Sequence, residues 1–193
     1  MKVSAIIMAS GFSQRMGRNK LTLNYQQQTF MERLFEVLLQ LDFHEICLVI
    51  SPENLLTLQQ PLPPTIKVIE NSEAGKGQTQ SVRLGTAAAT GEGFLFLPVD
   101  QPLLDATLLC ELWPHYDAQH IVFPVHENGQ PSSPIFFGQA FRSELLTVSG
   151  KGGGRSVRNA HPDAWRPVKV QQPQRLMDID TPAAYQRLLQ NFC

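Results

Sequence analysis

The chain has 193 residues, of which 42% are hydrophobic and 17% are charged, and its formal net charge at pH 7 is −1. This length and hydrophobic content allow a buried core and are typical of a soluble globular protein. The near-zero charge argues against a nucleic-acid partner, because such proteins usually carry an excess of basic residues, so any cationic site must be local.

In chain order, the first hundred residues alternate apolar runs with segments of helical periodicity. Continuous apolar runs predict buried strands, and apolar residues that recur every three or four positions predict amphipathic helices. We expect strands over residues 2–9, 45–51, 66–71 and 93–100, separated by helices over 30–41, 51–60 and 78–90. Buried strands that alternate with helices indicate a parallel sheet covered on both faces. The prediction is an α/β fold with three layers and a Rossmann-like, mostly parallel sheet.

The second half of the chain is less regular. We expect a helix over 105–116, strands over 120–129 and 133–138, a helix over 141–148, a glycine-rich loop over 149–156, a strand over 165–171 and a final helix after Thr181-Pro182. Threonine caps free backbone amides and proline lacks one, so the pair is typical of a helix start. Neither a repeat nor a linker interrupts the chain, and we predict a single domain over residues 1–193.

The cysteines and apolar runs give no sign of secretion, a membrane span or a zinc site. No apolar run approaches the roughly 18 residues that a spanning helix needs, and the amino terminus lacks a signal-peptide pattern. Cys47 and Cys110 lie in apolar runs, so we expect buried reduced thiols there and an exposed one at Cys193. We expect Trp113 and Trp165 to pack against the sheet and the five scattered histidines to have surface or packing roles. The sequence predicts a cytoplasmic protein with no membrane partner.

The stretch MASGFSQRMGRNK, residues 8–20, directly follows the first expected strand. Its glycines let backbone amides approach an anion, and its arginines and lysine supply positive charge. It has neither the Walker spacing nor the dinucleotide fingerprint, so residue types alone leave a phosphate loop and a solvated basic turn open. Ligands of parallel sheets bind beyond the carboxyl ends of the strands, where this loop meets the 71–81 segment and Asp100. This position favours a phosphate loop.

Carboxylates follow the fourth expected strand and precede the last helix. Asp100 closes the apolar run GFLFLPVD, and Asp178 and Asp180 lie in DIDTP. Magnesium prefers hard oxygen ligands and often takes one or two carboxylates together with substrate phosphates. The alternatives are a strand-end turn at Asp100 and an acidic helix entry at 178–180 that is favoured by the helix dipole. The spacing is compatible with a magnesium site.

Three motifs resemble those of a known family. SGFSQRMGRNK is similar to its AxGxSxRMGxxK signature after a first strand, PVDQPLL to its xxDQPLL, and LMDIDTPAAY to its DIDTPxDY. The motifs occur in the family's order and cover nearly the whole chain. The sequence thus resembles the MobA-like nucleotidyltransferases, and within them the molybdopterin cytidylyltransferase branch.

The resemblance implies a fold of the nucleotide-diphospho-sugar transferase type, with a nucleotide-binding half over 1–104 and an acceptor-binding half over 105–193. It implies that catalysis depends on Arg15, Lys20 and Asp100, with Mg²⁺ as cofactor. The metal ligands would be Asp100, Asp180 and, with less support from the motif, Asp178. The nucleotide would contact Ala9, Ser10, Gly11, Ser13, Arg15, Lys20, Asn71, Gly75 and Ser81.

Two motifs on the acceptor side depart from the family pattern. The family's PGHP is here PSSP, with Ser132 and Ser133 in place of Gly-His, and its GDxGAR is here GKGGGR. In the second motif Lys151 replaces an aspartate, while Arg155 is retained. Glycines beside cations form a plausible anion cradle, so Ser132, Ser133, Lys151 and Arg155 are predicted to bind the acceptor. A mobile glycine-rich surface loop is the alternative.

The implied reaction moves CMP from CTP to the phosphate of molybdopterin or its molybdenum-loaded form and releases pyrophosphate. The branch that uses cytidine has AAG where the guanine branch has GG, and Ala9-Ser10-Gly11 is nearer to AAG. Another nucleotide such as GTP, or a sugar or polyol phosphate as acceptor, stays open within the same fold. A non-catalytic accessory protein that passes a cofactor to a molybdoenzyme client is the alternative of another class.

Overall fold

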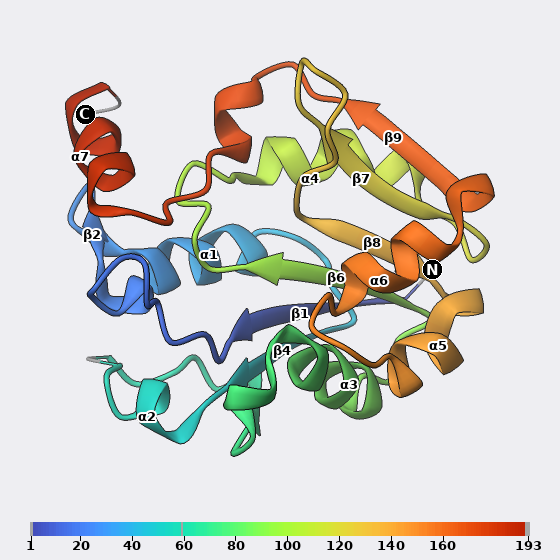
Figure 1. The fold of residues 1–193 in the computed structure, drawn as a ribbon, viewed down its shortest axis with the longest axis horizontal. Helices are drawn as coiled ribbons and strands as arrows, with labels where there is room; N and C mark the ends of the chain where they lie inside the picture. The colour runs from blue at the N-terminus through green and yellow to red at the C-terminus, as the bar shows by residue number, and fades with distance from the viewer. Residues whose placement is uncertain (1, 59, 192–193) are drawn as a thin grey trace.

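A seven-stranded sheet forms the centre of the computed structural model, which describes residues 2–58 and 60–191 (Figure 1). In sheet order, the strands are β5 (Ile66–Glu70), β4 (Glu45–Ile50), β1 (Val3–Ala9), β6 (Gly93–Pro98), β8 (Ile135–Gly138), β7 (Ile121–Val125) and β9 (Trp165–Lys169). The first four strands are mutually parallel, β8 is antiparallel to both of its neighbours, and β9 is parallel to β7. The predicted α/β fold with a mostly parallel sheet is confirmed.

Helices cover both faces of this sheet (Figure 1). One face packs against α1 (Phe30–Leu39), α4 (Ala106–Leu112) and α7 (Pro182–Asn191), the other against α3 (Gln78–Ala88), α5 (Arg142–Thr147) and α6 (Gly154–Ala160). Each buried aliphatic side chain in these two cores contributes about 1.5–3 kcal/mol of transfer free energy. Among the described helices, none is both long and apolar enough to cross a membrane.

Several local elements differ from the expectation. The helix expected over 51–60 is the short α2 (Pro52–Leu55), and the one expected over 105–116 ends at Leu112 and continues as a 3-10 turn. A small hairpin of β2 (Asn24–Tyr25) and β3 (Gln28–Thr29) and the helix α6 were not anticipated. Glycine disfavours helices by about 1 kcal/mol per residue, and α6 begins within a glycine-rich run, so packing of its buried face decides its conformation.

The predictions for Cys47, Trp113 and Trp165 are confirmed, whereas the prediction for Cys110 is not. Cys47 is buried on β4 as expected, and burial raises the pKa of its thiol to about 12. The prediction for Cys110 is wrong: its side chain is exposed, because the leucines of α4 on either side of it face the sheet. Cys193 lies outside the described residues. Trp113 packs on Phe136, and Trp165 packs on Phe123, both edge to face, as expected for residues against the sheet.

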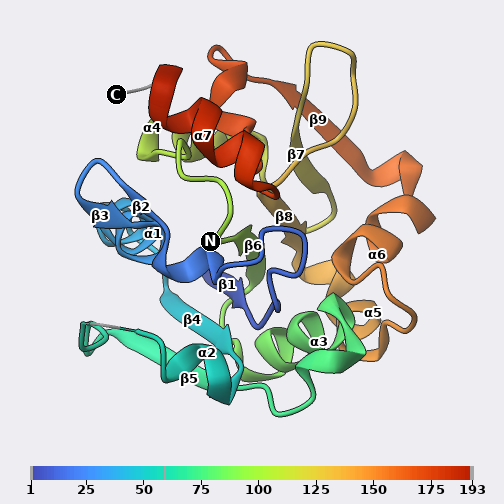
Figure 2. The ribbon, with the colours of Figure 1, turned by 60° about the vertical axis from the view of Figure 1, so that its left-hand side comes forward.

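Three segments meet at the carboxyl ends of β1 and β6. The loop after β1 lies between α7 and α3 in Figure 2. The segment before α7 is pinned to the end of β6, because the Ile179 amide donates to the Asp100 carbonyl at 2.8 Å. Ile179 itself is fully buried in the core, which fixes the position of its acidic neighbours. This edge of the sheet therefore carries the loop and the carboxylates together.

Candidate active site

A cleft of about 850 Å³ opens at this edge of the sheet. Its volume is near the upper end of the range for small-molecule sites, which is about 300–1,000 Å³. Every predicted site residue lines it except Asn71 and Lys151. The predicted residues in its lining are Ala9, Ser10, Gly11, Ser13, Arg15, Lys20, Gly75, Ser81, Asp100, Ser132, Ser133, Arg155, Asp178 and Asp180.

The loop after β1 is built around Ser13. The Ser13 backbone has a φ of +50°, and its carbonyl accepts from the Met16 amide at 3.0 Å and the Gly17 amide at 3.1 Å. Gly17 has a φ of +69°, a conformation that glycine adopts at little cost. The Ser13 hydroxyl accepts from the Lys20 amide at 3.1 Å, and the buried Met16 side chain anchors the loop in the core. These bonds fix the loop backbone in a compact turn.

Asn54, from α2, holds the loop from behind and was not anticipated. Its side-chain amide donates to the Ala9 carbonyl at 2.7 Å and to the Gly11 carbonyl at 3.1 Å. Its side-chain oxygen accepts from Asn19 at 3.1 Å, and the side chain is 8% exposed. Because both carbonyls point to Asn54, they are turned away from the cleft. An asparagine in the first turn of a short helix carries no sequence signal for this role.

Replacing Asn54 by alanine is expected to weaken nucleotide binding about tenfold and to lower the free energy of unfolding by about 1–3 kcal/mol, because the carbonyls of the buried Ala9 and of Gly11 lose their donor. Isothermal titration with nucleoside triphosphates and urea unfolding would measure the two effects. Thr57→Ala is the matched control, since Thr57 bonds Asn19 but neither carbonyl. Unchanged nucleotide affinity in Asn54→Ala would rule out this positioning role.

Lys20 lies between two of the predicted metal ligands. Its Nζ donates to Asp100 Oδ2 at 2.7 Å and also to Asp180 Oδ1. Burial alone would lower the pKa of Lys20, but the charges and hydrogen bonds of the two carboxylates outweigh it and raise the pKa. Arg15 Nη2 contacts Asp180 Oδ2 at 2.8 Å. In this state the two loop cations that line the cleft, Arg15 and Lys20, are neutralised by carboxylates.

The two aspartates of the 178–180 segment differ in their electrostatics. Burial raises the pKa of Asp178 to about 6, and the nearby charge of Asp100 adds to the shift. Burial acts in the same direction on Asp180, but the hydrogen bonds and charges of Lys20 and Arg15 prevail and lower its pKa. Near neutral pH, Asp100 and Asp180 share the cations, whereas Asp178 is the carboxylate that is least stabilised as an anion.

The segment predicted to contact the nucleotide is only partly in the cleft. Gly75 and Ser81 line it, but Asn71 is fully buried and does not. The Asn71 side chain donates to the Ser81 hydroxyl at 3.1 Å and accepts from the Glu73 amide at 3.1 Å. The predicted contact of Asn71 with the nucleotide therefore has no support from its position in this structure. Asn71 shapes the turn that presents Gly75 and Ser81.

At the other end of the cleft, the glycine-rich loop is attached to α3. The Thr79 hydroxyl donates to the Gly150 carbonyl at 2.6 Å and accepts from the Gly153 amide at 3.2 Å. Gly153 has a φ of +54°, and a Cβ there would lie 3.2 Å from the Gln78 Cβ. Lys151 is exposed and outside the cleft, so its predicted contact with the acceptor does not fit this structure. The loop serves to bring α6 against α3.

Three polar or charged side chains at this end of the cleft were not anticipated: His126, Gln78 and Arg158. His126 follows β7 and lies in the lining near Ser132 and Ser133, a position that the sequence did not single out. The tertiary structure brings these residues together from three separate elements, and no spacing in the sequence indicates the arrangement.

Residues 5–165 match the model of a known family, the MobA-like NTP transferase domain. The chain belongs to this family. The resemblance found in the three motifs is thereby confirmed, and the protein is a nucleotidyltransferase. Its mostly parallel α/β fold is that of a MobA-like enzyme.

Individual relatives of this MobA-like protein are distant in sequence. It is 25% identical over 182 residues to the molybdenum cofactor cytidylyltransferase of Escherichia coli (strain K12), covering 93% of this chain and 92% of that protein. The crystal structure of Rv0371C from Mycobacterium tuberculosis H37Rv in complex with manganese has a TM-score of 0.79 and 20% identity, over 99% of this chain and 100% of that one. The inositol-1-phosphate CTP transferase from T. maritima has a TM-score of 0.72 and 16% identity, over 95% and 93%. These structures share the fold.

The carboxylates of this MobA-like cleft fit a divalent cation. Asp100 and Asp180 already share one cation, the Lys20 ammonium, and their oxygens are the hard ligands that Mg²⁺ prefers. Within residues 2–58 and 60–191, no group of three or more His, Cys, Asp or Glu side chains is arranged to hold a metal by itself. Two carboxylates are sufficient when substrate phosphates and water complete the coordination.

Proposed function

We propose that this MobA-like protein transfers CMP from CTP to the phosphate monoester of molybdopterin, or of its molybdenum-loaded form, and uses Mg²⁺. Residues 1–104 would provide most of the nucleotide site and residues 105–193 most of the acceptor site. The observation that carries the proposal is the single cleft in which the loop cations Arg15 and Lys20 meet the carboxylates Asp100 and Asp180. The named relative from Escherichia coli supports the choice of acceptor and base.

The chemistry needs charge and positioning more than a general base. An oxygen of the acceptor phosphate forms a bond to the α-phosphorus of CTP, and the bond from that phosphorus to the β-phosphate oxygen breaks, with its electron pair leaving on pyrophosphate. A phosphate monoester has a second pKa of about 6, so it is already mostly dianionic near neutral pH. Magnesium, when bound, would neutralise charge on the phosphates. Lys20 and Arg15 would then stabilise the leaving pyrophosphate.

Lys20 must exchange partners for this to happen. In the free protein its ammonium group is held by Asp100 and Asp180, and Arg15 is held by Asp180. A cation at the carboxylates would release both side chains toward the triphosphate. The carboxylates would thus hold the metal, while the loop cations and the amides of Gly11 and Ser13 would bind the phosphates.

The base is proposed to be cytosine. Ser10 occupies the position where the cytidine-using branch has alanine, and its hydroxyl donates to the Val49 carbonyl at 3.2 Å. The side chain is 6% exposed, so the hydroxyl is used within the protein rather than offered to a ligand. The serine therefore presents to the cleft a surface similar to that of the alanine it replaces, which supports the cytidine assignment.

A pyrophosphate-release assay tests the proposal. The purified protein would be given Mg²⁺, each of the four nucleoside triphosphates, and either molybdopterin or a polyol phosphate such as inositol 1-phosphate. We expect pyrophosphate release with CTP and molybdopterin, and little with the other pairs. A preference for GTP would overturn the base assignment, and turnover with the polyol phosphate alone would overturn the acceptor. Nucleotide binding without turnover by any pair would favour the accessory protein.

A further inference from the structure

Arg158, from α6, is a buried cation in the lining of the cleft. It is 7% exposed, yet it lines the cleft together with Arg155 of the same helix. Within the described part of the chain, neither arginine has a carboxylate oxygen within 4.0 Å, whereas the other two cations of the cleft, Arg15 and Lys20, are both paired with aspartates. The positive charge at the α6 end of the cleft is thus uncompensated.

The partners of Arg158 orient its guanidinium but do not neutralise it. Its Nε and Nη2 donate to Asn159 Oδ1 at 3.2 and 3.0 Å, and the guanidinium lies over the rings of Phe123 and Trp165, 5.1 and 5.9 Å from their centroids. Its remaining nitrogen, Nη1, has no hydrogen-bond partner in residues 2–58 and 60–191. Burial, and after it the charge of Arg155, lowers the pKa of Arg158.

An arrangement of this kind is unfavourable in the free protein. A buried charge without a counter-charge loses solvation that the protein does not replace, and a second cation beside it adds repulsion. A purely structural arginine would be expected to have a carboxylate partner, as Arg175 has with Asp105 and Glu111. A ligand that brings negative charge would remove both penalties.

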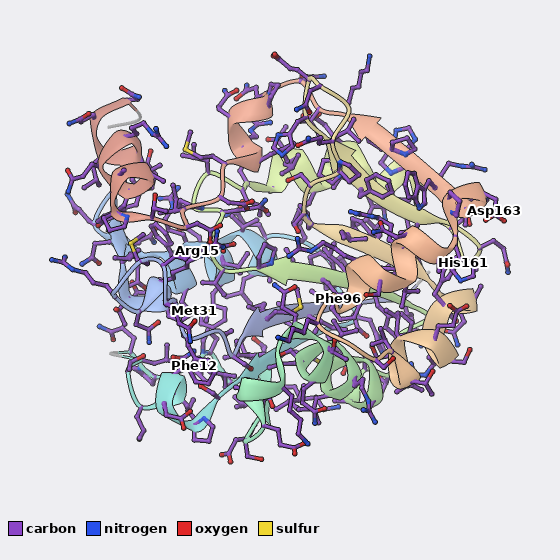
Figure 3. All side chains as sticks on the ribbon, viewed as in Figure 1. Phe12, Arg15, Met31, Phe96, His161 and Asp163 are labelled. Atoms are coloured by element: carbon purple, nitrogen blue, oxygen red, sulfur yellow. The ribbon has the colours of Figure 1, made fainter. Side chains whose placement is uncertain are left out.

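We propose that Arg158 and Arg155 together bind the phosphate of the acceptor. This inference rests on the proposed function, since it places the attacking phosphate at the α6 end of the same cleft that holds the triphosphate at the other end. Figure 3 marks Arg15 at the loop end and Phe96, on the cleft floor, between the two ends. The planar guanidinium suits phosphate, because it can donate two parallel hydrogen bonds to its oxygens. The stacked rings hold that plane before the ligand arrives.

The assignment differs from the sequence prediction in the residue that supplies the second charge. Lys151, predicted from the loop motif, is exposed and outside the cleft, whereas Arg158 lies three residues beyond Arg155 on the same face of α6. Arg155 Nη2 contacts Gln78 Oε1 at 3.4 Å, a neutral and weak partner, so it also keeps its positive charge available.

The test is the binding of inorganic phosphate to the full chain, measured by titration calorimetry while the nucleotide site is filled with Mg²⁺ and a CTP analogue that has a methylene between its α- and β-phosphates. We expect Arg158→Gln and Arg155→Gln each to weaken phosphate binding at least tenfold. Lys151→Gln, the matched control, should stay within twofold of wild type. Binding of the analogue should be unchanged in all three variants.

Arg158→Lys keeps the charge and separates lost binding from lost folding. If Arg158→Lys unfolds at a temperature close to that of the wild type but binds phosphate severalfold more weakly, the role of the guanidinium is supported. Wild-type phosphate affinity in both Arg158→Gln and Arg155→Gln would overturn the inference without contradicting the proposed nucleotide site. If the analogue does not bind the wild type, the proposed nucleotide site fails, and the same titration without the analogue then decides the phosphate site separately.

Discussion

Asp100→Asn is expected to reduce kcat/KM for nucleotidyl transfer by at least about 10³-fold while the protein stays folded. Asp100 follows β6 and is one of the two carboxylates that we propose as metal ligands, and an amide is a far weaker ligand for Mg²⁺ than a carboxylate. The free energy of unfolding should change by less than about 1 kcal/mol, because Lys20 keeps Asp180 as a partner. Steady-state pyrophosphate release and thermal unfolding measure the two quantities.

Asp163→Asn is the matched control for this substitution. Asp163 is exposed, lies at the right-hand end of the molecule in Figure 3, far from Arg15, and does not line the cleft, so the loss of its charge should leave turnover unchanged. Full activity of Asp100→Asn with Mg²⁺ would contradict the proposal that Asp100 is a metal ligand. Loss of activity together with a collapsed thermal transition would instead place Asp100 among residues that the fold requires.

Lys20→Gln should have the second-largest effect, acting on both activity and stability. Without its ammonium group, turnover is expected to fall about 10²–10³-fold, because the leaving pyrophosphate loses a positioned charge. The carboxylates of Asp100, Asp178 and Asp180 would also lose the nearby positive charge of Lys20. Added Mg²⁺ should therefore raise the thermal transition of Lys20→Gln more than that of the wild type, since the metal can replace the missing charge at Asp100 and Asp180.

The stability of Lys20→Gln should fall more steeply with rising pH than the stability of the wild type. Burial already raises the pKa of Asp178 to about 6, so the folded protein favours the protonated form of this side chain. The stability that Asp178 contributes is therefore fully present below its unfolded pKa, near 3.8, and is lost as the pH rises through about 6. In wild type, Lys20 lowers the pKa of Asp180, whose contribution is present above about 3.8 and lost only in acid. Removing Lys20 should raise the pKa values of Asp178 and Asp180, because the charge of Lys20 lowers both. The variant should lose more stability than wild type between about pH 5 and pH 8.

Thermal unfolding at these two pH values, with and without Mg²⁺, checks both expectations. Lys67→Gln is the control. Lys67, on the edge strand β5 and outside the cleft lining, also pairs with a carboxylate, that of Glu45 on β4. An equal loss of stability at both pH values in Lys20→Gln would show that the carboxylates do not repel one another in the absence of the lysine.

Local sequence signals located much of the cleft because its chemistry lies at strand ends. Asp100 follows a continuous apolar strand, and the loop of residues 8–20 follows another, so the topology of a parallel sheet is enough to bring them to one edge. The same argument could not reach Asn54. Its role depends on the direction in which α2 leaves the sheet, which no periodicity encodes.

At the acceptor end of the cleft, local sequence signals located few of the residues that the structure places there. Lys151 and Asn71 were expected to contact ligands because their positions match motif positions, yet one is exposed outside the cleft and the other is buried beneath it. Arg158 carries no motif, and its helix begins in a glycine-rich run that disfavours helices. Burial and charge pairing depend on contacts between α6, β7 and β9, which are far apart in the sequence.

The sequence by itself determined the α/β layering and placed the loop of residues 8–20 and the three aspartates at one edge of the sheet, because strand and helix periodicity and local motifs are encoded by neighbouring residues. Only the tertiary structure decided which cations are neutralised and which are not. Lys20 and Arg15 are paired because the 178–180 segment is pinned to Asp100, and Arg158 is unpaired because the elements around it present aromatic rings and an amide. Charge compensation is a property of side chains brought together from distant segments, so it follows from packing rather than from local pattern.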